Sequence, residues 1–344
     1  MTRRLVIDLA SPRAAWRIPG DRVAEIRAAL GSQWDVVQIQ APAASDGDGG
    51  SGSPQSIAAA RGAEVYLGYG VPAGVASAGQ GTLRWAHSGT AGVGSSLEYL
   101  AGSGIVLTNS AGVHAEPMAD WVIAAIGYFA RGLDRMIAAQ RQGGGRWAKD
   151  EFTDLGVPLR EYRDLRLGIL GLGGIGAAVA RRGLSLGMSV AGVRRHPQRE
   201  SLPGTRWVGG LAELPRLAAE SDCLVIAAPH TAATAGAVNR SVLERLPRNA
   251  LVINVSRGSL LDEAALLELL DAGRLGGAAL DVFGVEPLPA AHPFWAHARV
   301  LVSPHVSAVT NRFWERETAL IVDNIGRYLA GAPLTNVVDL EAGY

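Results

Sequence analysis

The chain has 344 residues, 48% of them hydrophobic and 19% charged, which is a globular composition long enough for about two domains. Lys plus Arg and Asp plus Glu both number 32, so this balance favours neither nucleic acid nor a membrane surface as a partner. The single cysteine, Cys223, excludes an intrachain disulfide framework, and its apolar neighbours predict a buried thiol. We see no signal peptide and no run that could span a bilayer, and we expect a cytoplasmic protein.

Strand and helix signals alternate in the first part of the chain. Residues 21–30 have helical periodicity, with their apolar side chains on one face. Residues 41–55 are rich in glycine, serine and proline, which predicts a surface loop. This alternation indicates a parallel sheet covered by helices. The predicted strands span 4–9, 65–68, 83–86 and 105–108.

A long helix separates these signals from a second, stronger series. Apolar periodicity predicts one helix over 116–141, and the run Gly143-Gly144-Gly145 is expected to end it. Six predicted strands with intervening helices follow, as a dinucleotide-binding domain requires. Residues 313–330 read as a final amphipathic helix. The six strands span 167–170, 189–193, 223–227, 251–255, 277–281 and 300–302.

A G-x-G-x-x-G motif joins the first of these strands to a helix. Gly171 permits the tight turn, Gly173 lets a pyrophosphate approach the backbone, and Gly176 lets the helix pack closely on the strand. Amide groups and the helix dipole at this end attract an anion. Such a motif is weak evidence alone, but the strand, the helix and a second strand at the right distance support a nucleotide site here. The predicted contacts are Gly171, Gly173, Gly174, Ile175 and Gly176.

Two arginines end the next predicted strand. An NAD-binding domain usually places an acidic side chain near Arg194 to accept bonds from the ribose hydroxyls. Arg194 cannot accept them, but it can pair with a 2′-phosphate, and Arg195 can stack on adenine. A solvated basic turn is the plain alternative. Because the pair coincides with the ribose position, we predict NADP as the preferred cofactor, with NAD possible.

Three side chains downstream point to hydride chemistry on a carboxylate-bearing substrate. Arg257 follows a predicted strand and can hold a carboxylate or polarise a carbonyl. His305 can exchange the proton that accompanies hydride transfer, and Glu286 can orient it. The alternatives are that Arg257 caps a strand and Glu286 is a surface carboxylate. The other six histidines are expected on the surface, in a cofactor groove or in turns.

These motifs together resemble the D-isomer-specific 2-hydroxyacid dehydrogenases over most of the chain. The resemblance implies a Rossmann dinucleotide-binding domain (114–312) inserted into a flavodoxin-like substrate domain (1–113 and 313–344). It also implies an active site in the cleft between the domains. The motifs that carry it include Thr108-Asn109-Ser110, Pro229-His230-Thr231, Asn254-Val255-Ser256-Arg257-Gly258, Asp281 through Pro287, and Ser303-Pro304-His305.

The resemblance also assigns roles to single residues. Arg257 would bind the substrate carboxylate and carbonyl oxygen, and His305 would be the acid/base with Glu286 as its partner. The backbone amides of Ala91 and Gly92 would bind the substrate carboxylate. The implied cofactor contacts are Asp281, at the nicotinamide carboxamide, and Pro229 and Thr231, along the cofactor groove. No metal site is expected.

The sequence therefore predicts an NADPH-preferring reductase of small 2-keto acids, with glyoxylate or hydroxypyruvate as leading substrates. One rival is a dinucleotide-sensing binding protein like the C-terminal-binding corepressors; a rival within the class is a phosphoglycerate dehydrogenase-like enzyme. The apolar stretch at 116–141 is longer than one domain face needs, and the family builds a twofold dimer there, so we expect a homodimer. Trp147 could then reach the partner's cleft, as a similarly placed tryptophan does in some glyoxylate reductases.

Overall fold

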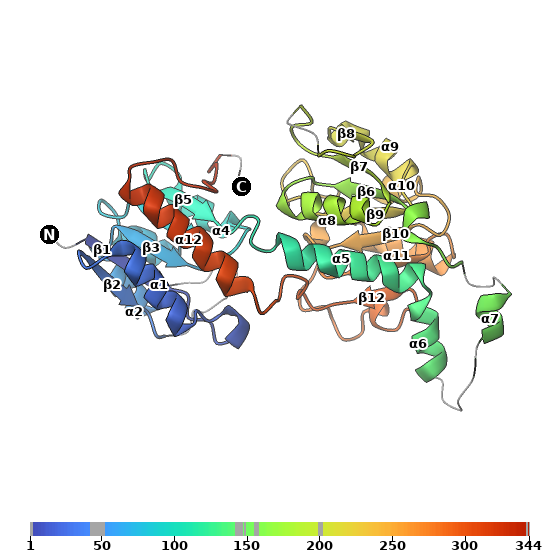
Figure 1. Cartoon of the computed structure of the whole chain (residues 1–344), viewed down its shortest axis with the longest axis horizontal. Helices are drawn as coiled ribbons and strands as arrows, with labels where there is room; N and C mark the ends of the chain where they lie inside the picture. The colour runs from blue at the N-terminus through green and yellow to red at the C-terminus, as the bar shows by residue number, and fades with distance from the viewer. Residues whose placement is uncertain are drawn as a thin grey trace. The chain divides into compact units, whose positions relative to one another are not determined.

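The computed structural model describes residues 3–41, 52–141, 147, 149–154, 158–198, 202–341 and 343. The chain divides into two compact units (Figure 1). We call Met1–His114 with Val309–Tyr344 the first unit, and Ala115–Ala308 the second unit. The sequence-based boundaries at 113 and 312 refer to separately folding domains, and that remains a prediction.

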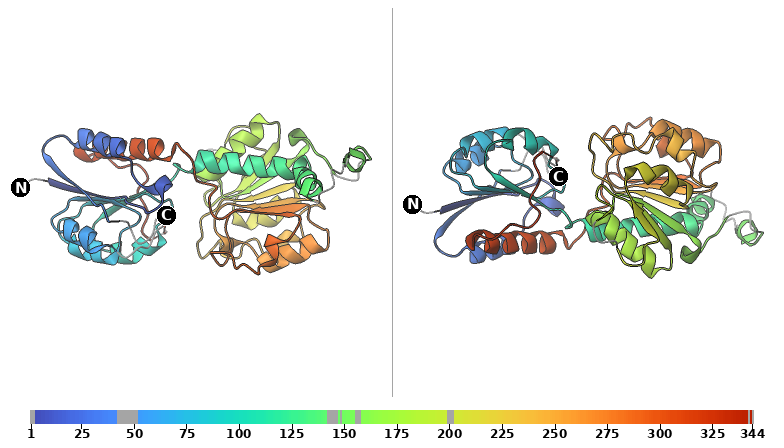
Figure 2. Two further views of the ribbon diagram at one scale, coloured as in Figure 1. Left: turned by 90° about the horizontal axis from the view of Figure 1, so that it is seen from below. Right: turned by 90° about the horizontal axis from the view of Figure 1, so that it is seen from above.

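The first unit is a parallel five-stranded sheet in the order β2-β1-β3-β4-β5, which is the flavodoxin-like order. Helices α1 and α12 cover one face, and α2, α3 and α4 cover the other (Figure 2). Successive side chains of a strand point to opposite sides, so each strand contributes apolar side chains to both of these covered faces. The strands are β1 (Arg3–Asp8), β2 (Trp34–Gln38), β3 (Val65–Gly68), β4 (Trp85–Ser88) and β5 (Val106–Asn109). The helices are α1 (Gly20–Leu30), α2 (Pro54–Ala60), α3 (Ala73–Ala78), α4 (Gly94–Leu100) and α12 (Phe313–Leu329).

The second unit is a parallel seven-stranded sheet in the order β12-β11-β10-β9-β6-β7-β8, a Rossmann order extended by one strand. Helices α5 and α8 pack on one face, and α9, α10 and α11 on the other (Figure 2). The strands are β6 (Arg166–Leu170), β7 (Ser189–Val193), β8 (Trp207–Gly209), β9 (Cys223–Ile226), β10 (Leu251–Asn254), β11 (Gly277–Leu280) and β12 (Val300–Val302). The helices are α5 (Ala115–Ala130), α6 (Leu133–Arg141), α7 (Lys149–Thr153), α8 (Gly174–Ser185), α9 (Leu214–Ala219), α10 (Arg240–Leu243) and α11 (Glu263–Asp271).

The predicted fold class, two doubly wound parallel sheets, is confirmed. The single helix predicted over 116–141 is wrong, because α5 ends before Gly132, whose φ of 65° is left-handed. Glycine adopts that conformation without steric cost and commonly ends helices. The triglycine run expected to end the helix lies outside the described residues, as does most of the loop predicted at 41–55. That loop prediction is wrong at its end, where α2 begins at Pro54.

Burial agrees with one sequence expectation and corrects another. Cys223 is fully buried, and burial raises the pKa of its thiol to about 12. His87, expected on the surface, in a cofactor groove or in a turn, is instead fully buried and contacts the equally buried Glu317 (Nε2 to Oε1, 3.0 Å). Among the described helices, none has the length and apolar character needed to cross a membrane.

Candidate active site

The three predicted catalytic residues all lie beyond the carboxyl ends of neighbouring strands. Arg257 follows β10, Glu286 follows β11, and His305 follows β12. These strands are adjacent in the sheet, and all run in the same direction. Ligands of open parallel α/β sheets bind at this edge. The sheet therefore brings three residues that are distant in sequence to one corner of the second unit.

Glu286 and His305 are in direct contact. Oε2 of Glu286 lies 2.8 Å from Nδ1 of His305, and Oε1 accepts a hydrogen bond from the Phe283 amide at 2.9 Å. Because a carboxylate can only accept, this contact places the proton of the imidazole on Nδ1. Nε2 is then the ring atom that can exchange a proton with a substrate. The His305 side chain is 48% exposed, so a small molecule can reach it.

Asp281 holds the loop that carries His305. Its carboxylate is fully buried and accepts hydrogen bonds from the Ser303 hydroxyl, the Val306 amide (2.8 Å) and the Ser307 amide (3.0 Å). Its carbonyl accepts from the His305 amide at 2.9 Å. His305 itself has a left-handed φ of 55°, a conformation that folded proteins keep where surrounding contacts enforce it. Asp281 thus fixes the position of His305; its predicted contact with the nicotinamide carboxamide remains a prediction.

Arg257 presents its guanidinium at the surface of the same corner. The buried Asn254 orders the backbone before it, accepting from the Ser256 amide (3.1 Å) and donating to the Arg257 carbonyl (3.0 Å). The guanidinium donates to the Ser256 carbonyl through Nη1 at 2.6 Å. Within the described residues no carboxylate forms an ion pair with Arg257. Its remaining donors can therefore bind an anionic substrate.

Glycine brings the arginine and glutamate loops together. A Cβ atom on Gly258, the residue after Arg257, would lie 1.9 Å from the Phe283 carbonyl carbon, so only glycine fits. Across this contact, Oε1 of Glu263 accepts from the Gly284 amide at 2.7 Å. Burial raises the pKa of Glu263, and the Gly284 amide opposes that shift. The loop that carries Glu286 is thus anchored to the beginning of α11.

The glycine motif has the geometry that a dinucleotide needs. Gly171 has a φ of +98°, and a Cβ there would lie 2.5 Å from the Ala228 backbone. A Cβ on Gly176 would lie 1.9 Å from the Gly171 carbonyl oxygen, so α8 packs directly on the turn. A Cβ on Gly173 would meet no described atom within 4 Å. The turn is therefore open at the residue where a pyrophosphate would approach the amides at the beginning of α8.

The other predicted cofactor residues border this turn. The Gly171 amide donates to the Val193 carbonyl at 2.9 Å, which places Arg194 directly beside the turn. Arg195 follows it and is exposed. After β9, the hydroxyl of Thr234 donates to the Pro229 carbonyl (2.6 Å) and accepts from the Thr231 amide (2.8 Å). The ends of β6, β7 and β9 thus present these residues along one edge of the sheet.

Ala91 and Gly92 belong to the first unit, in the loop after β4, and both are partly exposed. Trp147 is 86% exposed. Its neighbour Arg146 lies outside the described residues.

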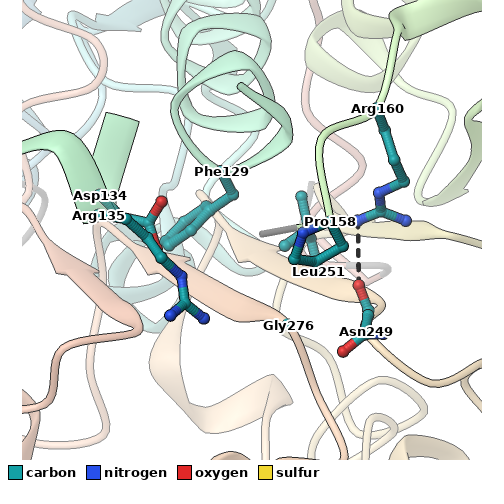
Figure 3. A pocket seen from close by; sticks show the side chains of 8 residues that line it. All are labelled: Phe129, Asp134, Arg135, Pro158, Arg160, Asn249, Leu251 and Gly276. Carbon is teal, nitrogen blue, oxygen red and sulfur yellow. Dashed lines mark hydrogen bonds between the residues drawn. The ribbon is translucent and has the colours of Figure 1, made fainter. Parts of the chain in front are cut away.

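A pocket of the second unit lies at the opposite edge of the sheet. Asn249 and Gly276 line it just before β10 and β11 begin, and Arg160 donates to the Asn249 carbonyl at 3.0 Å (Figure 3). Burial raises the pKa of Asp134 in its wall. Because Arg257, Glu286 and His305 follow the other ends of these strands, this pocket is separate from the catalytic corner. The complete lining is Phe129, Asp134, Arg135, Pro158, Arg160, Asn249, Leu251 and Gly276.

Sequence reasoning missed the residues that hold the catalytic loops. Asn254 and Ser303 stand in motifs of the resemblance but had no assigned role, Glu263 stands in none, and each acts through hydrogen bonds of its side chain. A polar residue that ends an otherwise apolar strand, as Asn254 does, was the one available signal, because a buried polar group needs a partner.

Comparisons with known proteins agree with this arrangement. The family model for the NAD-binding domain of D-isomer-specific 2-hydroxyacid dehydrogenases matches residues 123–307. A glyoxylate/hydroxypyruvate reductase A of Yersinia enterocolitica is 34% identical over 260 residues, which are 75% of each chain. A D-isomer-specific 2-hydroxyacid dehydrogenase of Xanthobacter autotrophicus Py2, solved in complex with NADPH and MES, superposes over both whole chains with a TM-score of 0.80 and 32% identity.

A third protein, an NADPH-dependent glyoxylate/hydroxypyruvate reductase of Sinorhizobium meliloti solved with NADP and sulfate, has a TM-score of 0.76 and 26% identity. The match covers 99% of this chain and all of that one. The family model covers more than half of the chain, and the Yersinia relative is similar over three quarters of it. The chain therefore belongs to the D-isomer-specific 2-hydroxyacid dehydrogenases, a family of NAD(P)-dependent oxidoreductases.

Proposed function

We propose that the chain is an NADPH-preferring reductase that converts small 2-keto acids, such as glyoxylate or hydroxypyruvate, to D-2-hydroxy acids. The observation that carries the proposal is the 2.8 Å contact between His305 Nδ1 and Glu286 Oε2, at the same edge of the sheet as the exposed Arg257. It supplies a proton donor and an anion holder at one corner. Relatives with similar sequence and structure bear the name glyoxylate/hydroxypyruvate reductase.

The chemistry assigns one task to each side chain. When bound, the reduced nicotinamide supplies the hydride that adds to C2 of the keto acid. Arg257 holds the carboxylate and carbonyl oxygen and stabilises the negative charge that develops there. The Nε2–H bond of His305 breaks as the new O–H bond forms, so the developing alkoxide becomes the hydroxyl group of the product. Glu286 keeps the ring oriented through Nδ1, and the half-exposed ring regains its proton from solvent.

Cofactor preference follows from Arg194 and Arg195. The 2′-phosphate of NADP carries nearly two negative charges, and a guanidinium binds it through charge-assisted hydrogen bonds. The 2′-hydroxyl of NAD is uncharged, so it cannot form a charge-assisted hydrogen bond of this kind with the guanidinium. Arg194 lies beside the glycine turn through the Gly171 to Val193 hydrogen bond. Both of the similar solved structures described above contain NADPH or NADP.

A panel of 2-keto acids tests this function. Purified protein should oxidise NADPH steadily with glyoxylate or hydroxypyruvate, and more slowly with 3-phosphohydroxypyruvate. Faster turnover with the phosphorylated acid would favour the phosphoglycerate dehydrogenase-like alternative. Tight binding of NADPH without turnover of any keto acid would favour the corepressor-like alternative instead. The enzyme names of the relatives support the reductase.

We also propose that the protein is a homodimer that pairs through the stretch at 116–141, which forms α5 and α6. Leu133 and Met136 of α6 are 41% and 43% exposed, and apolar side chains exposed in this way favour a protein partner. Trp147 is available for a contact with the partner's substrate site. Light scattering at micromolar concentration should give twice the mass of one chain. A monomer would contradict the dimer and remove Trp147 as a contact between subunits.

A further inference from the structure

Three consecutive carbonyl groups in the loop after β4 each accept a hydrogen bond, two of them from residues at the end of β5. The Thr90 carbonyl accepts from the Ser110 amide at 3.1 Å. The Ala91 carbonyl accepts from Nδ2 of Asn109 at 2.8 Å, and the Gly92 carbonyl accepts from the Thr90 hydroxyl at 2.6 Å. The loop contains no charged side chain. Its one polar side chain, the Thr90 hydroxyl, is bound within the loop, so the backbone supplies the polar groups that remain.

The direction of these carbonyls fixes the direction of the next amides. In a trans peptide the C=O and N–H groups point opposite ways. With the Thr90 and Ala91 carbonyls bound by the end of β5, the amides of Ala91 and Gly92 face away from that strand. Neither amide donates to an acceptor in the described part of the chain. Two adjacent amides that face outward form a concave site for an anion.

We propose that Asn109 and Thr90 are positioning residues that aim the Ala91 and Gly92 amides at the substrate carboxylate. The inference rests on the proposed function and names the groups that set its affinity for 2-keto acids. Neither side chain needs to touch the substrate. Asn109 holds the Ala91 carbonyl, which belongs to the same peptide as the Gly92 amide. Thr90 holds the Gly92 carbonyl, which belongs to the next peptide.

Asn109 is itself fixed in one orientation. It is 5% exposed, and its Oδ1 accepts from the Ala111 amide at 3.1 Å. Because that contact requires an oxygen, the amide nitrogen of the side chain must face the Ala91 carbonyl. Its backbone exchanges hydrogen bonds with Asn336, whose carbonyl accepts from the Asn109 amide (3.1 Å) and whose Nδ2 donates to the Asn109 carbonyl (3.2 Å). Asn109 therefore cannot turn its donor away without losing other bonds.

The Thr90 hydroxyl is oriented by a similar chain of bonds. Ser88 Oγ accepts from the Gly70 amide at 3.1 Å and lies 2.9 Å from Thr90 Oγ1. A hydroxyl has one proton, and that of Thr90 is given to Gly92. Ser88 must therefore donate to Thr90. The hydrogen bonds then run in one direction, from the Gly70 amide through the two hydroxyls to the Gly92 carbonyl. Removal of the Thr90 hydroxyl breaks this order at the loop itself.

The experiment compares Asn109→Ala and Thr90→Val with the unaltered protein. Thr90→Ser is the conservative variant, because it keeps the hydroxyl. Thr82→Val is the matched control, since the Thr82 hydroxyl also donates to a loop carbonyl of the first unit, that of Gly79 at 3.1 Å. For each variant we would measure kcat and KM for glyoxylate, the dissociation constants of oxamate and NADPH, and the melting temperature.

The substrate carboxylate is bound in the ground state and in the transition state alike. Weaker binding of this group should therefore raise KM more than it lowers kcat. We expect KM for glyoxylate and the oxamate dissociation constant to rise about tenfold in Asn109→Ala and Thr90→Val, as the loss of one hydrogen bond to a charged group would give. NADPH affinity should be unchanged. Thr90→Ser and Thr82→Val should keep the KM of the unaltered protein.

Two different failures are distinguishable. If the unaltered protein reduces glyoxylate but Asn109→Ala and Thr90→Val keep its KM and its oxamate affinity, the inference is overturned and the proposed function stands. A lower melting temperature with unchanged KM and oxamate affinity would likewise assign both residues a purely structural role. If the unaltered protein neither turns over any keto acid nor binds oxamate, the proposed function fails, and the inference fails with it.

Discussion

The carboxyl edges of the two sheets present different chemistry. In the second unit, charged side chains reach the surface at the ends of neighbouring strands, with Arg257 and His305 exposed and Glu286 in contact with the histidine. In the first unit, the loop after β4 presents backbone amides, while its one polar side chain, that of Thr90, is hydrogen-bonded to Ser88 and to the Gly92 carbonyl. One edge is suited to moving a proton and stabilising a charge; the other is suited only to holding an anion.

The two edges are also held in different ways. The buried carboxylate of Asp281 fixes the His305 loop through three accepted hydrogen bonds, whereas neutral groups from Asn109 and Thr90 fix the Ala91 loop. A carboxylate side chain in the first loop would compete with an anionic ligand for the amides of Ala91 and Gly92. This difference between the two edges predicts that substitution of His305 or Arg257 lowers the rate of catalysis. Substitution of the Ala91 side chain should have little effect on kinetics.

The largest expected effect is that of His305→Ala. Removal of the proton donor should lower kcat about 10²- to 10⁴-fold, the range for a general acid, with NADPH affinity unchanged. His297→Ala is the matched control, because His297 also contacts a carboxylate of the same unit, that of Asp271 at 3.3 Å. Steady-state kinetics should separate the two variants. Near-normal turnover in His305→Ala would show that His305 is not the proton donor.

Arg257→Lys should have the next largest effect. Lysine keeps the charge but loses the planar fork that binds two oxygens. If the lost contact contributes about 1.5–3 kcal/mol, kcat/KM should fall roughly 10- to 150-fold. Thermal denaturation should show little change in the melting temperature. An unstable variant whose folded fraction works normally would instead support the strand-cap role of Arg257.

Arg194→Asp tests whether side-chain charge also sets cofactor choice. The unaltered protein should prefer NADPH over NADH by about ten- to a hundredfold, from one charge-assisted contact to the phosphate. Aspartate repels that phosphate and accepts bonds from the ribose hydroxyls, so the preference should reverse. The ratio of kcat/KM values for the two cofactors measures it. Equal efficiency of the unaltered protein with both cofactors would leave Arg194 and Arg195 as a solvated basic turn.

Ala91→Ser should have the smallest effect. The substitution adds a hydroxyl but keeps the backbone amide, which is the proposed binding group. We expect KM for glyoxylate to change less than about threefold, because side chains outside a packed or paired position contribute little. A tenfold rise in KM, equal to that expected for Asn109→Ala, would show that the side chain at 91 matters and would weaken the contrast between the two edges.

The difference between the edges also explains what the sequence could predict. The chemistry of Arg257, Glu286 and His305 could be predicted because it follows from their residue types. Their common location could be predicted because the loops that follow parallel strands lie at one edge of the sheet. The inner contacts of Asp281 and Asn109 depend on which loops meet in three dimensions, so no local pattern reports them. The short edge strands β2 and β8 were missed because they are largely half-buried and lack an apolar run. The early end of α5 depends on the backbone conformation of one glycine, Gly132.

The most direct test of the account is the reduction of hydroxypyruvate by NADPH with the purified protein, followed by chiral analysis of the glycerate formed. Family membership and the His305–Glu286 pair predict steady NADPH oxidation and D-glycerate as the product. L-glycerate would contradict the D-specificity of the proposed function. The absence of turnover with hydroxypyruvate and with glyoxylate would contradict the proposed function itself.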